Sequence, residues 1–327
     1  MTFRNFPCNR NVMSRMKLWV LVCLSLYSVA AAQEPAAIRV DVGLVNVGFS
    51  VRDTGGKLIT NLTQDDVEIT EDGMPQKISF FARSADVPLN LGLVMDMSGS
   101  QHSFLKPHMH DVQAFLKSVL RSQDKAYIMA FGNRLTLVSD YTSSAKLLVE
   151  SLEEYRKPKS RIEYPSVGPR ELRREGTAFY DAVFYGSTLM MQNIERGRRA
   201  LIIFSDGEDN SSAHHMLDTI EAAQANDVQL YCIRYTEDAH DGRLTARNKY
   251  GISVMARIAR ETGGADFDGR GKGLVDSFRE IGEQLRSGYE LGYHTSNPPG
   301  DQTFHKIAIR VKRPGAVVRA KTGYFGR

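Results

Sequence analysis

The chain has 327 residues, of which 42% are hydrophobic and 24% are charged, and its formal net charge is +4 at pH 7. This composition is ordinary for a folded protein with one large domain and one small one, and it excludes a disordered or fibrous chain. The sequence does not repeat itself at periods of about 20 to 50 residues, which excludes a solenoid.

Residues 1–32 are predicted to be an export signal peptide. The basic residues that open it are Arg4, Arg10, Arg15 and Lys17. Residues 18–29 are apolar, and three alanines at 30–32 offer small side chains for cleavage. The expected location is periplasmic, at the outer surface or secreted, with no membrane span after cleavage. The apolar run is short for a membrane span. An uncleaved N-terminal anchor is the alternative, because the basic segment before the run is long and the flanking residues could extend the run.

The signal also accounts for the net charge. Residues 1–32 contain four of the 42 Lys and Arg residues and none of the 38 Asp and Glu residues. Removing them leaves 38 basic against 38 acidic residues, so the mature chain is formally neutral. The sequence pI of about 8.8 therefore gives no reason to expect a nucleic-acid partner.

Residues 33–86 and 288–327 each consist of short predicted strands separated by turn sequences. In the N-terminal segment the strands are expected at 38–51, 67–70 and 76–81. In the C-terminal segment they are expected at 289–294, 304–312 and 317–321. Neither end holds enough strands to close a core alone. We therefore expect the two ends to pair into one small β-sandwich-like module, with two independent β extensions as the alternative.

Residues 87–287 are predicted to form a doubly wound α/β domain, because apolar strands alternate with helical segments. Buried parallel strands are expected at 90–95, 126–131, 200–204 and 228–233. Residues 135–139 follow the second of these too closely for a crossover, so they form an antiparallel hairpin partner. Helices are expected at 104–121, 144–155, 177–191, 214–226, 251–262 and 272–287. The expected fold is a Rossmann-like, mostly parallel sheet with one antiparallel strand and helices on both faces.

Carboxylates and hydroxyls directly follow two of these strands. Asp96 opens the sequence Asp-Met-Ser-Gly-Ser, which also contains Ser98 and Ser100, and Asp206 follows the strand at 200–204. Ligands of open α/β sheets bind beyond the carboxyl ends of the strands, so the two carboxylates are expected to converge. Between them in sequence, Thr177 precedes a helix in a Gly-Thr pair. Each piece alone also suits a helix cap or a turn.

Taken together, Asp-x-Ser-x-Ser, Gly-Thr and Asp-Gly resemble the metal-ion-dependent adhesion site of von Willebrand factor type A (VWA) domains, over residues 88–287. The resemblance implies a metal ion with direct ligands Ser98, Ser100 and Thr177. It implies that Asp96 and Asp206 bind directly or through water. The segment leading to Asp96, the β unit at 63–81 and a Gly-Tyr-Phe end at 323–325 further resemble the exported VWA-related proteins of Acidobacteria.

The donor set agrees with this resemblance, because hydroxyl and carboxylate oxygens are hard ligands suited to Mg²⁺, Mn²⁺ or Ca²⁺. Mg²⁺ is expected first, since a small octahedral site that keeps waters fits hydroxyl ligands. An open coordination position then accepts a Glu or Asp from a protein partner. The expected function is therefore metal-dependent binding or adhesion without catalysis.

The surroundings of the site are expected to select the partner. The candidates are Gln101, His102, Glu208, Asp209, His214, His215 and the segment 157–174. That segment, with Arg156 before it, is basic. Two interpretations are equally well supported: a positively charged rim of the site that binds an acidic ligand, or a solvated surface loop. The two histidines are expected at a helix surface or cap, because adjacent side chains on a helix point apart.

Two other function classes stay open. The sequence contains no Gly-x-Ser-x-Gly, no phosphate-binding loop and no His-Glu-x-x-His. A metal-assisted hydrolase that uses the same metal would need Glu175, Glu208 or Asp209 as a general base. The remaining class is a structural envelope protein in which the β module does the binding.

Overall fold

The structure is a computed structural model, and it describes residues 43–98, 102–157, 160, 162–169, 176–191, 194, 197–235, 244–269, 273–298 and 300–326. The predicted export signal, Ser100, Gln101 and Glu175 lie outside the described residues. In the part of the chain that is described, no helix has the length and apolar character needed to cross a membrane.

A six-stranded sheet forms the centre of the α/β region, in the order β10-β9-β8-β5-β6-β7. Its strands are β5 (Leu89–Asp96), β6 (Lys125–Phe131), β7 (Leu135–Thr142), β8 (Arg198–Ser205), β9 (Val228–Arg234) and β10 (Ala265–Asp268). Only β7 is antiparallel to its neighbour, which confirms the predicted mostly parallel sheet. Because β6 and β8 lie on opposite sides of β5, the winding reverses there. The ends of β5 and β8 therefore form the switch point of the sheet.

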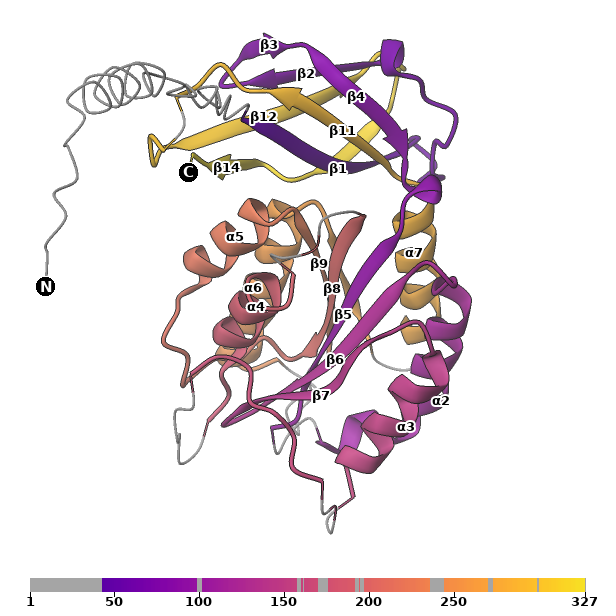
Figure 1. Cartoon of the computed structure of the whole chain (residues 1–327), viewed down its shortest axis with the longest axis vertical. Helices are drawn as coiled ribbons and strands as arrows, with labels where there is room; N and C mark the ends of the chain where they lie inside the picture. The colour runs from indigo at the N-terminus through magenta and orange to yellow at the C-terminus, as the bar shows by residue number, and fades with distance from the viewer. Residues whose placement is uncertain are drawn as a thin grey trace, which may run out of the picture. The chain divides into compact units, whose positions relative to one another are not determined.

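Helices cover both faces of this sheet (Figure 1). On one face, α2 (His102–Val119), α3 (Ala145–Tyr155) and α7 (Gly273–Ser287) share a core cluster with Leu91 and Leu93 of β5. On the other, α4 (Phe179–Ser187), α5 (Met216–Ala225) and α6 (Ala246–Glu261) pack with Leu201 and Ile203 of β8. The strands are apolar on both sides because both sides are covered.

Helix α6 begins five residues before the predicted position. The backbone N–H of Asn248 donates to Thr245 Oγ1 (3.1 Å), and the backbone N–H of Thr245 donates to Asn248 Oδ1 (3.2 Å). This reciprocal cap satisfies donors that the first turn of a helix leaves free. The early start adds a turn to the helix, and this turn carries Arg247.

Two further sheets each combine strands from both ends of the described chain. Their orders are β13-β1-β11-β4 and β14-β12-β2-β3. The N-terminal strands are β1 (Leu44–Arg52), β2 (Val67–Glu71), β3 (Met74–Gln76) and β4 (Ile78–Arg83). The C-terminal strands are β11 (Tyr289–His294), β12 (Phe304–Val311), β13 (Val317–Ala320) and β14 (Gly323–Phe325). Phe49 of β1, Ile69 of β2 and Tyr289 of β11 share one core cluster, so neither end forms a separate extension.

Buried polar contacts join the α/β region to these sheets. Arg198, at the start of β8, is 4% exposed and donates to Ser84 Oγ and to Gln229 Oε1. Gln229 in turn donates from Nε2 to the carbonyl of Gly48 in β1 (3.1 Å). The backbone N–H of Thr322 donates to the Glu261 carbonyl (3.1 Å) at the end of α6. Residues Val42–Arg327 accordingly form one compact unit.

Candidate functional site

Asp96 is the last residue of β5 and is only 2% exposed. Its Oδ2 accepts a hydrogen bond from Ser205 Oγ (2.7 Å), and its Oδ1 accepts one from the Ser98 backbone N–H (2.9 Å). Ser205 reaches Asp96 because β8 lies beside β5 in parallel register. Burial raises the pKa of Asp96 to about 6 against these hydrogen bonds, and the nearby charge of Asp206 adds to the rise. A desolvated carboxylate is thus held beside a second one.

Asp206 follows β8 and is 7% exposed. Its Oδ1 accepts a hydrogen bond from the Glu208 backbone N–H (3.0 Å). The loop packs backbone to backbone on α6, since a Cβ on Gly207 would lie 2.5 Å from the Gly251 carbonyl oxygen, and a Cβ on Gly251 would lie 2.3 Å from that of Asp206. Gly207 also has a φ of +77°, a conformation that favours glycine. The close approach of α6 therefore fixes the position of Asp206.

Thr177 precedes α4 and is tied to the Asp206 loop by one side chain. Asn210 Oδ1 accepts a hydrogen bond from the Thr177 backbone N–H (2.7 Å), and the Asn210 backbone N–H donates to the Thr177 carbonyl (3.1 Å). On the other side, the Ala178 backbone N–H donates to the Gly132 carbonyl after β6 (3.1 Å). These bonds hold the Thr177 segment between two strand ends.

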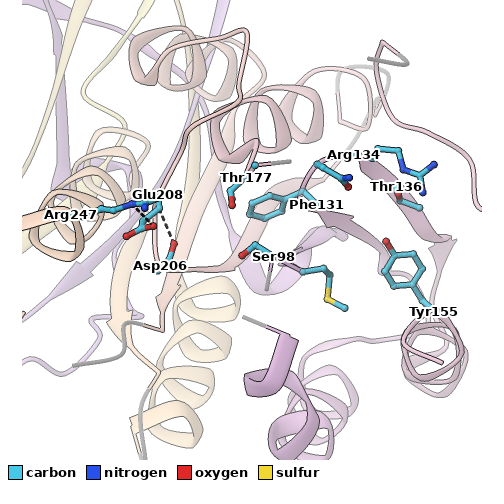
Figure 2. A pocket seen from close by; sticks show the side chains of 13 residues that line it. Ser98, Phe131, Arg134, Thr136, Tyr155, Thr177, Asp206, Glu208 and Arg247 are labelled. Atoms are coloured by element: carbon cyan, nitrogen blue, oxygen red, sulfur yellow. Dashed lines mark hydrogen bonds and ion pairs between the residues drawn. The ribbon is translucent and has the colours of Figure 1, made fainter. Parts of the chain in front are cut away.

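Three of the five predicted site residues line one cavity of about 580 Å³ (Figure 2). They are Ser98, Thr177 and Asp206, which come from three separate segments. Asp96 is not among the lining residues, but it is bonded to the backbone of Ser98. Ser100 lies outside the described residues. The structure thus brings together Asp96, Ser98, Thr177 and Asp206 at the switch point.

The donor chemistry of these residues fits a hard divalent cation. Each contributes oxygen atoms, and the mutual repulsion of Asp96 and Asp206 is of the kind that a cation relieves. Within the described ranges, no three or more His, Cys, Asp or Glu side chains are grouped so that they could hold a metal ion. Any ion bound there by described residues would therefore depend on hydroxyl oxygens as well as on carboxylates.

Sequence reasoning missed three residues that shape the site. Ser205 supports Asp96, and Asn210 holds Thr177. The third, Arg247 of α6, lines the cavity and pairs through Nε with Glu208 Oε2 at 2.6 Å. Burial and the charge of Asp206 raise the pKa of Glu208, and Arg247 opposes this rise. The sequence does contain a signal for Arg247. Thr245 and Asn248 form a Thr-x-x-Asn helix cap, which places Arg247 in the first turn of α6.

Other residues predicted near the rim have local roles. The His215 backbone N–H donates to Asp218 Oδ2 (2.7 Å) at the start of α5, where His215 is the N-cap. The His214 ring lies 2.7 Å from Asp181 Oδ1 and stacks on Phe184. Asp209 Oδ2 accepts a hydrogen bond from the Tyr180 backbone N–H (3.1 Å). His215 therefore has the predicted cap role, whereas His214 precedes the helix and packs against Phe184 and Asp181.

The basic segment is described only in part. Lys157 pairs with Glu154 (2.5 Å) on α3. Further on, the Val167 backbone N–H donates to the Leu135 carbonyl (3.1 Å), so this stretch is anchored to β7. The basic residues that lie outside the described chain are Lys159, Arg161, Arg170, Arg173 and Arg174.

The chain matches no family model and no curated protein. Among solved structures, it is similar to the conserved hypothetical protein BatB from Bacteroides thetaiotaomicron, with 17% identity, coverage of 61% of this chain and 100% of that one, and a TM-score of 0.44. It is also similar to the vWF domain of the type V pili tip protein Mfa5 from Porphyromonas gingivalis, with 11% identity, coverage of 61% and 95%, and a TM-score of 0.43. A third is proximal thread matrix protein 1 from the mussel byssus, with a zinc-occupied MIDAS motif, at 12% identity, coverage of 66% and 49%, and a TM-score of 0.45.

Proposed function

We propose that this chain is an exported binding protein of the VWA type, which captures an acidic group of a protein partner through a divalent cation. The observation that carries the proposal is the convergence of Asp96, Ser98, Thr177 and Asp206 at the switch point of the sheet. Open α/β sheets bind their ligands at this place. Mg²⁺ is the first candidate for the cation, with Mn²⁺ and Ca²⁺ as alternatives.

The roles of the residues are those that the resemblance to VWA domains implies. Ser98, Ser100 and Thr177 would be direct ligands, and Asp96 and Asp206 would bind directly or through water. The bound cation would supply a coordination position for a carboxylate from the partner. Because at most two carboxylates of the protein face the ion, it keeps positive charge that attracts an acidic group.

Two observations support binding over hydrolysis at this site. A hydrolase would need a general base free to take a proton from water. Glu208 is paired with Arg247 at 2.6 Å, and Asp209 accepts hydrogen bonds from the Tyr180 backbone and from Ser212. Both described candidates are therefore engaged in contacts that hold the loop in place.

The remaining features complete the proposal. Residues 1–32 direct export, and the sheets built from β1–β4 and β11–β14 form a β-sandwich-like module that carries the binding domain. A formally neutral mature chain favours a specific acidic group as the target over a polyanion such as nucleic acid.

Calorimetric titration of Mg²⁺, Mn²⁺ and Ca²⁺ into the metal-stripped protein tests the proposal. We expect one-to-one binding of at least one cation, and loss of that heat in Asp96→Ala. Asp276→Asn is the matched control, because Asp276 is an exposed carboxylate on α7 paired only with Arg279 within the described structure. A folded wild type that takes up none of the three cations would overturn the proposal.

A further inference from the structure

Two arginine side chains line the cavity, and the structure holds them differently. Arg247 is anchored through Nε, 2.6 Å from Glu208 Oε2, with its side chain 62% exposed. Arg134, after β6, is exposed and makes no hydrogen bond or ion pair with any residue in the described ranges. Only Arg247 therefore has a fixed orientation before a ligand arrives.

A short chain of contacts links Arg247 to the proposed cation ligands. Asp206 Oδ1 accepts the backbone N–H of Glu208 (3.0 Å), and the Glu208 carboxylate in turn pairs with Arg247 (Figure 2). The Asp206 loop rests directly on α6, the helix that carries Arg247. The position of the guanidinium is thus tied to that of Asp206 by one hydrogen bond, one ion pair and one packed helix.

The way Glu208 holds Arg247 leaves a binding edge open. A guanidinium has five N–H donors in a planar fork, and its two terminal amino groups bind a carboxylate through two parallel hydrogen bonds. The contact with Glu208 uses Nε, and Arg247 forms no other interaction with a described residue. Without Arg247, the Glu208 carboxylate would instead repel an acidic ligand, because the two groups carry the same charge.

We propose that Arg247, positioned by Glu208, is a second anion-binding group of this cavity, so that the partner presents two carboxylates. One carboxylate binds the cation and the other binds the terminal amino groups of Arg247. This inference rests on the proposed function and adds a specificity determinant to it: a ligand with a single acidic group forms half of the contacts. Glu208 is the positioning residue.

The test uses capped peptides that differ by one charge. An Asp-(Gly)n-Asp series with several spacer lengths is compared with Asp-(Gly)n-Asn, all N-acetylated and C-amidated, in saturating Mg²⁺. At the best spacer we expect the two-carboxylate peptide to bind about tenfold more tightly, as one added charge-assisted bidentate contact supplies. Arg247→Gln should remove this advantage, and Glu208→Gln should reduce it.

Arg257→Gln is the matched control. Arg257 lies on the same helix and also bonds through Nε to a glutamate, Glu261 (2.7 Å), but it does not line the cavity. This variant should keep the full advantage of the two-carboxylate peptide. A second readout is the nitrogen resonance of Arg247 Nε, which should shift with this peptide and, at higher peptide concentration, also in EDTA.

The outcomes separate this inference from the proposed function. Cation binding together with equal affinities for the two peptides would overturn the role of Arg247 and leave the proposed function standing. An advantage lost in Arg134→Gln but kept in Arg247→Gln would also overturn it. Failure of all three cations to bind would overturn both.

Discussion

At the scale of single residues, the interior position of Asp96 depends on one hydroxyl. Burying a carboxylate is costly unless its oxygens accept hydrogen bonds. Ser205 supplies one of these bonds at 2.7 Å, and its Oγ also accepts the Gly207 backbone N–H at 3.1 Å. Ser205 therefore connects the end of β5 to the loop that carries Asp206.

Ser205→Ala should lower the free energy of unfolding by about 1–3 kcal/mol. The reason is that Asp96 Oδ2 loses a hydrogen-bond donor and the Gly207 backbone N–H loses its acceptor. Urea denaturation of the metal-free protein measures the change. Ser187→Ala is the control, since Ser187 is equally buried and its Oγ has no hydrogen-bond partner among the described residues. Equal losses in the two variants would contradict the role given to Ser205.

His305 of β12 makes the stability of the terminal sheets depend on pH. Its Nδ1 lies 2.8 Å from Asp72 Oδ2, and its Nε2 lies 2.9 Å from Asp301 Oδ2. Burial lowers the pKa of His305, but the two carboxylates outweigh it, and the pKa is raised above 6.5. A hydrogen bond from the His305 ring lowers the pKa of Asp72. A hydrogen bond from the Thr303 backbone lowers the pKa of Asp301.

The sign of the effect follows from linkage. A raised histidine pKa stabilises the fold below about pH 6.5, and this stabilisation is lost as the pH rises through the raised value. The lowered aspartate pKa values stabilise the fold above about pH 4, and this share is lost in acid. His305→Gln should therefore lose most stability, relative to wild type, between about pH 4.5 and 6.

Urea titrations at several pH values check this prediction. The difference in unfolding free energy between wild type and His305→Gln should shrink toward pH 9. His294→Gln, at an exposed histidine of β11, should show a small difference that does not vary in this way. A His305→Gln difference that grows toward alkaline pH would rule out the charged arrangement.

The sequence predicted the residues that carry oxygen donors but not those that hold them. Asp96, Ser98, Thr177 and Asp206 stand in recognisable positions after strands and before a helix. The bond from Ser205 to Asp96 exists only because β8 lies beside β5, and sequence spacing does not contain that pairing.

At the scale of elements, α6 is the main addition of the structure to the predicted site. Gly251 lets this helix touch the backbone of the Asp206 loop. Gly282 of α7 is also in a helix, but a Cβ there would meet nothing within 4 Å. A side chain at residue 251 would therefore collide with the Asp206 loop, whereas one at residue 282 would not collide with anything.

Gly251→Ala should destabilise the protein and weaken cation binding, because the new methyl group would push the Asp206 carbonyl away. Gly282→Ala should instead stabilise the protein by about 0.5–1 kcal/mol, as alanine favours a helix. Thermal unfolding and cation titration of both variants measure these effects. Stabilisation by alanine at both positions would show that the loop does not depend on close contact with α6.

Long apolar elements were predicted well, whereas three short strands were missed, although the four-residue β13 was predicted. The strands β3, β10 and β14 have three or four residues each, and β10 reads Ala-Asp-Phe-Asp. Such segments lack a hydrophobic period of their own and are strands because a neighbouring strand pairs with them. β10, for example, lies parallel to β9 at the edge of the sheet.

At the scale of the whole molecule, Arg198 is one of the buried contacts between the α/β region and the terminal β segments. It reaches Ser84 in η2 (Ser84–Asp86) and the Gln284 carbonyl at the end of α7. The neighbouring Arg199 donates instead to the Asn226 carbonyl (3.0 Å), inside the α/β region. Arg198 thus makes a contact between the two regions, whereas Arg199 makes a contact within the α/β region.

Arg198→Met should lower the free energy of unfolding by about 1–3 kcal/mol, because it leaves buried acceptors without donors. Hydrogen exchange should show protection lost in both β8 and β11. In Arg199→Met the loss should stay within the α/β region. Loss confined to β8 in both variants would mean that Arg198 does not couple the two regions.

The pairing of β1 with β11 has a consequence during synthesis. β4 ends at Arg83 and β11 begins at Tyr289, so the ribosome must add the entire α/β region before either terminal sheet can be completed. At 5–20 residues per second, this delay is on the order of ten to forty seconds. During this delay the first strands keep unpaired edges that invite aggregation. When β11 is synthesised, the α/β region already contains all of its own strands. The connectivity therefore favours a fixed order, in which the α/β region folds first and the closing of the terminal sheets is the last event.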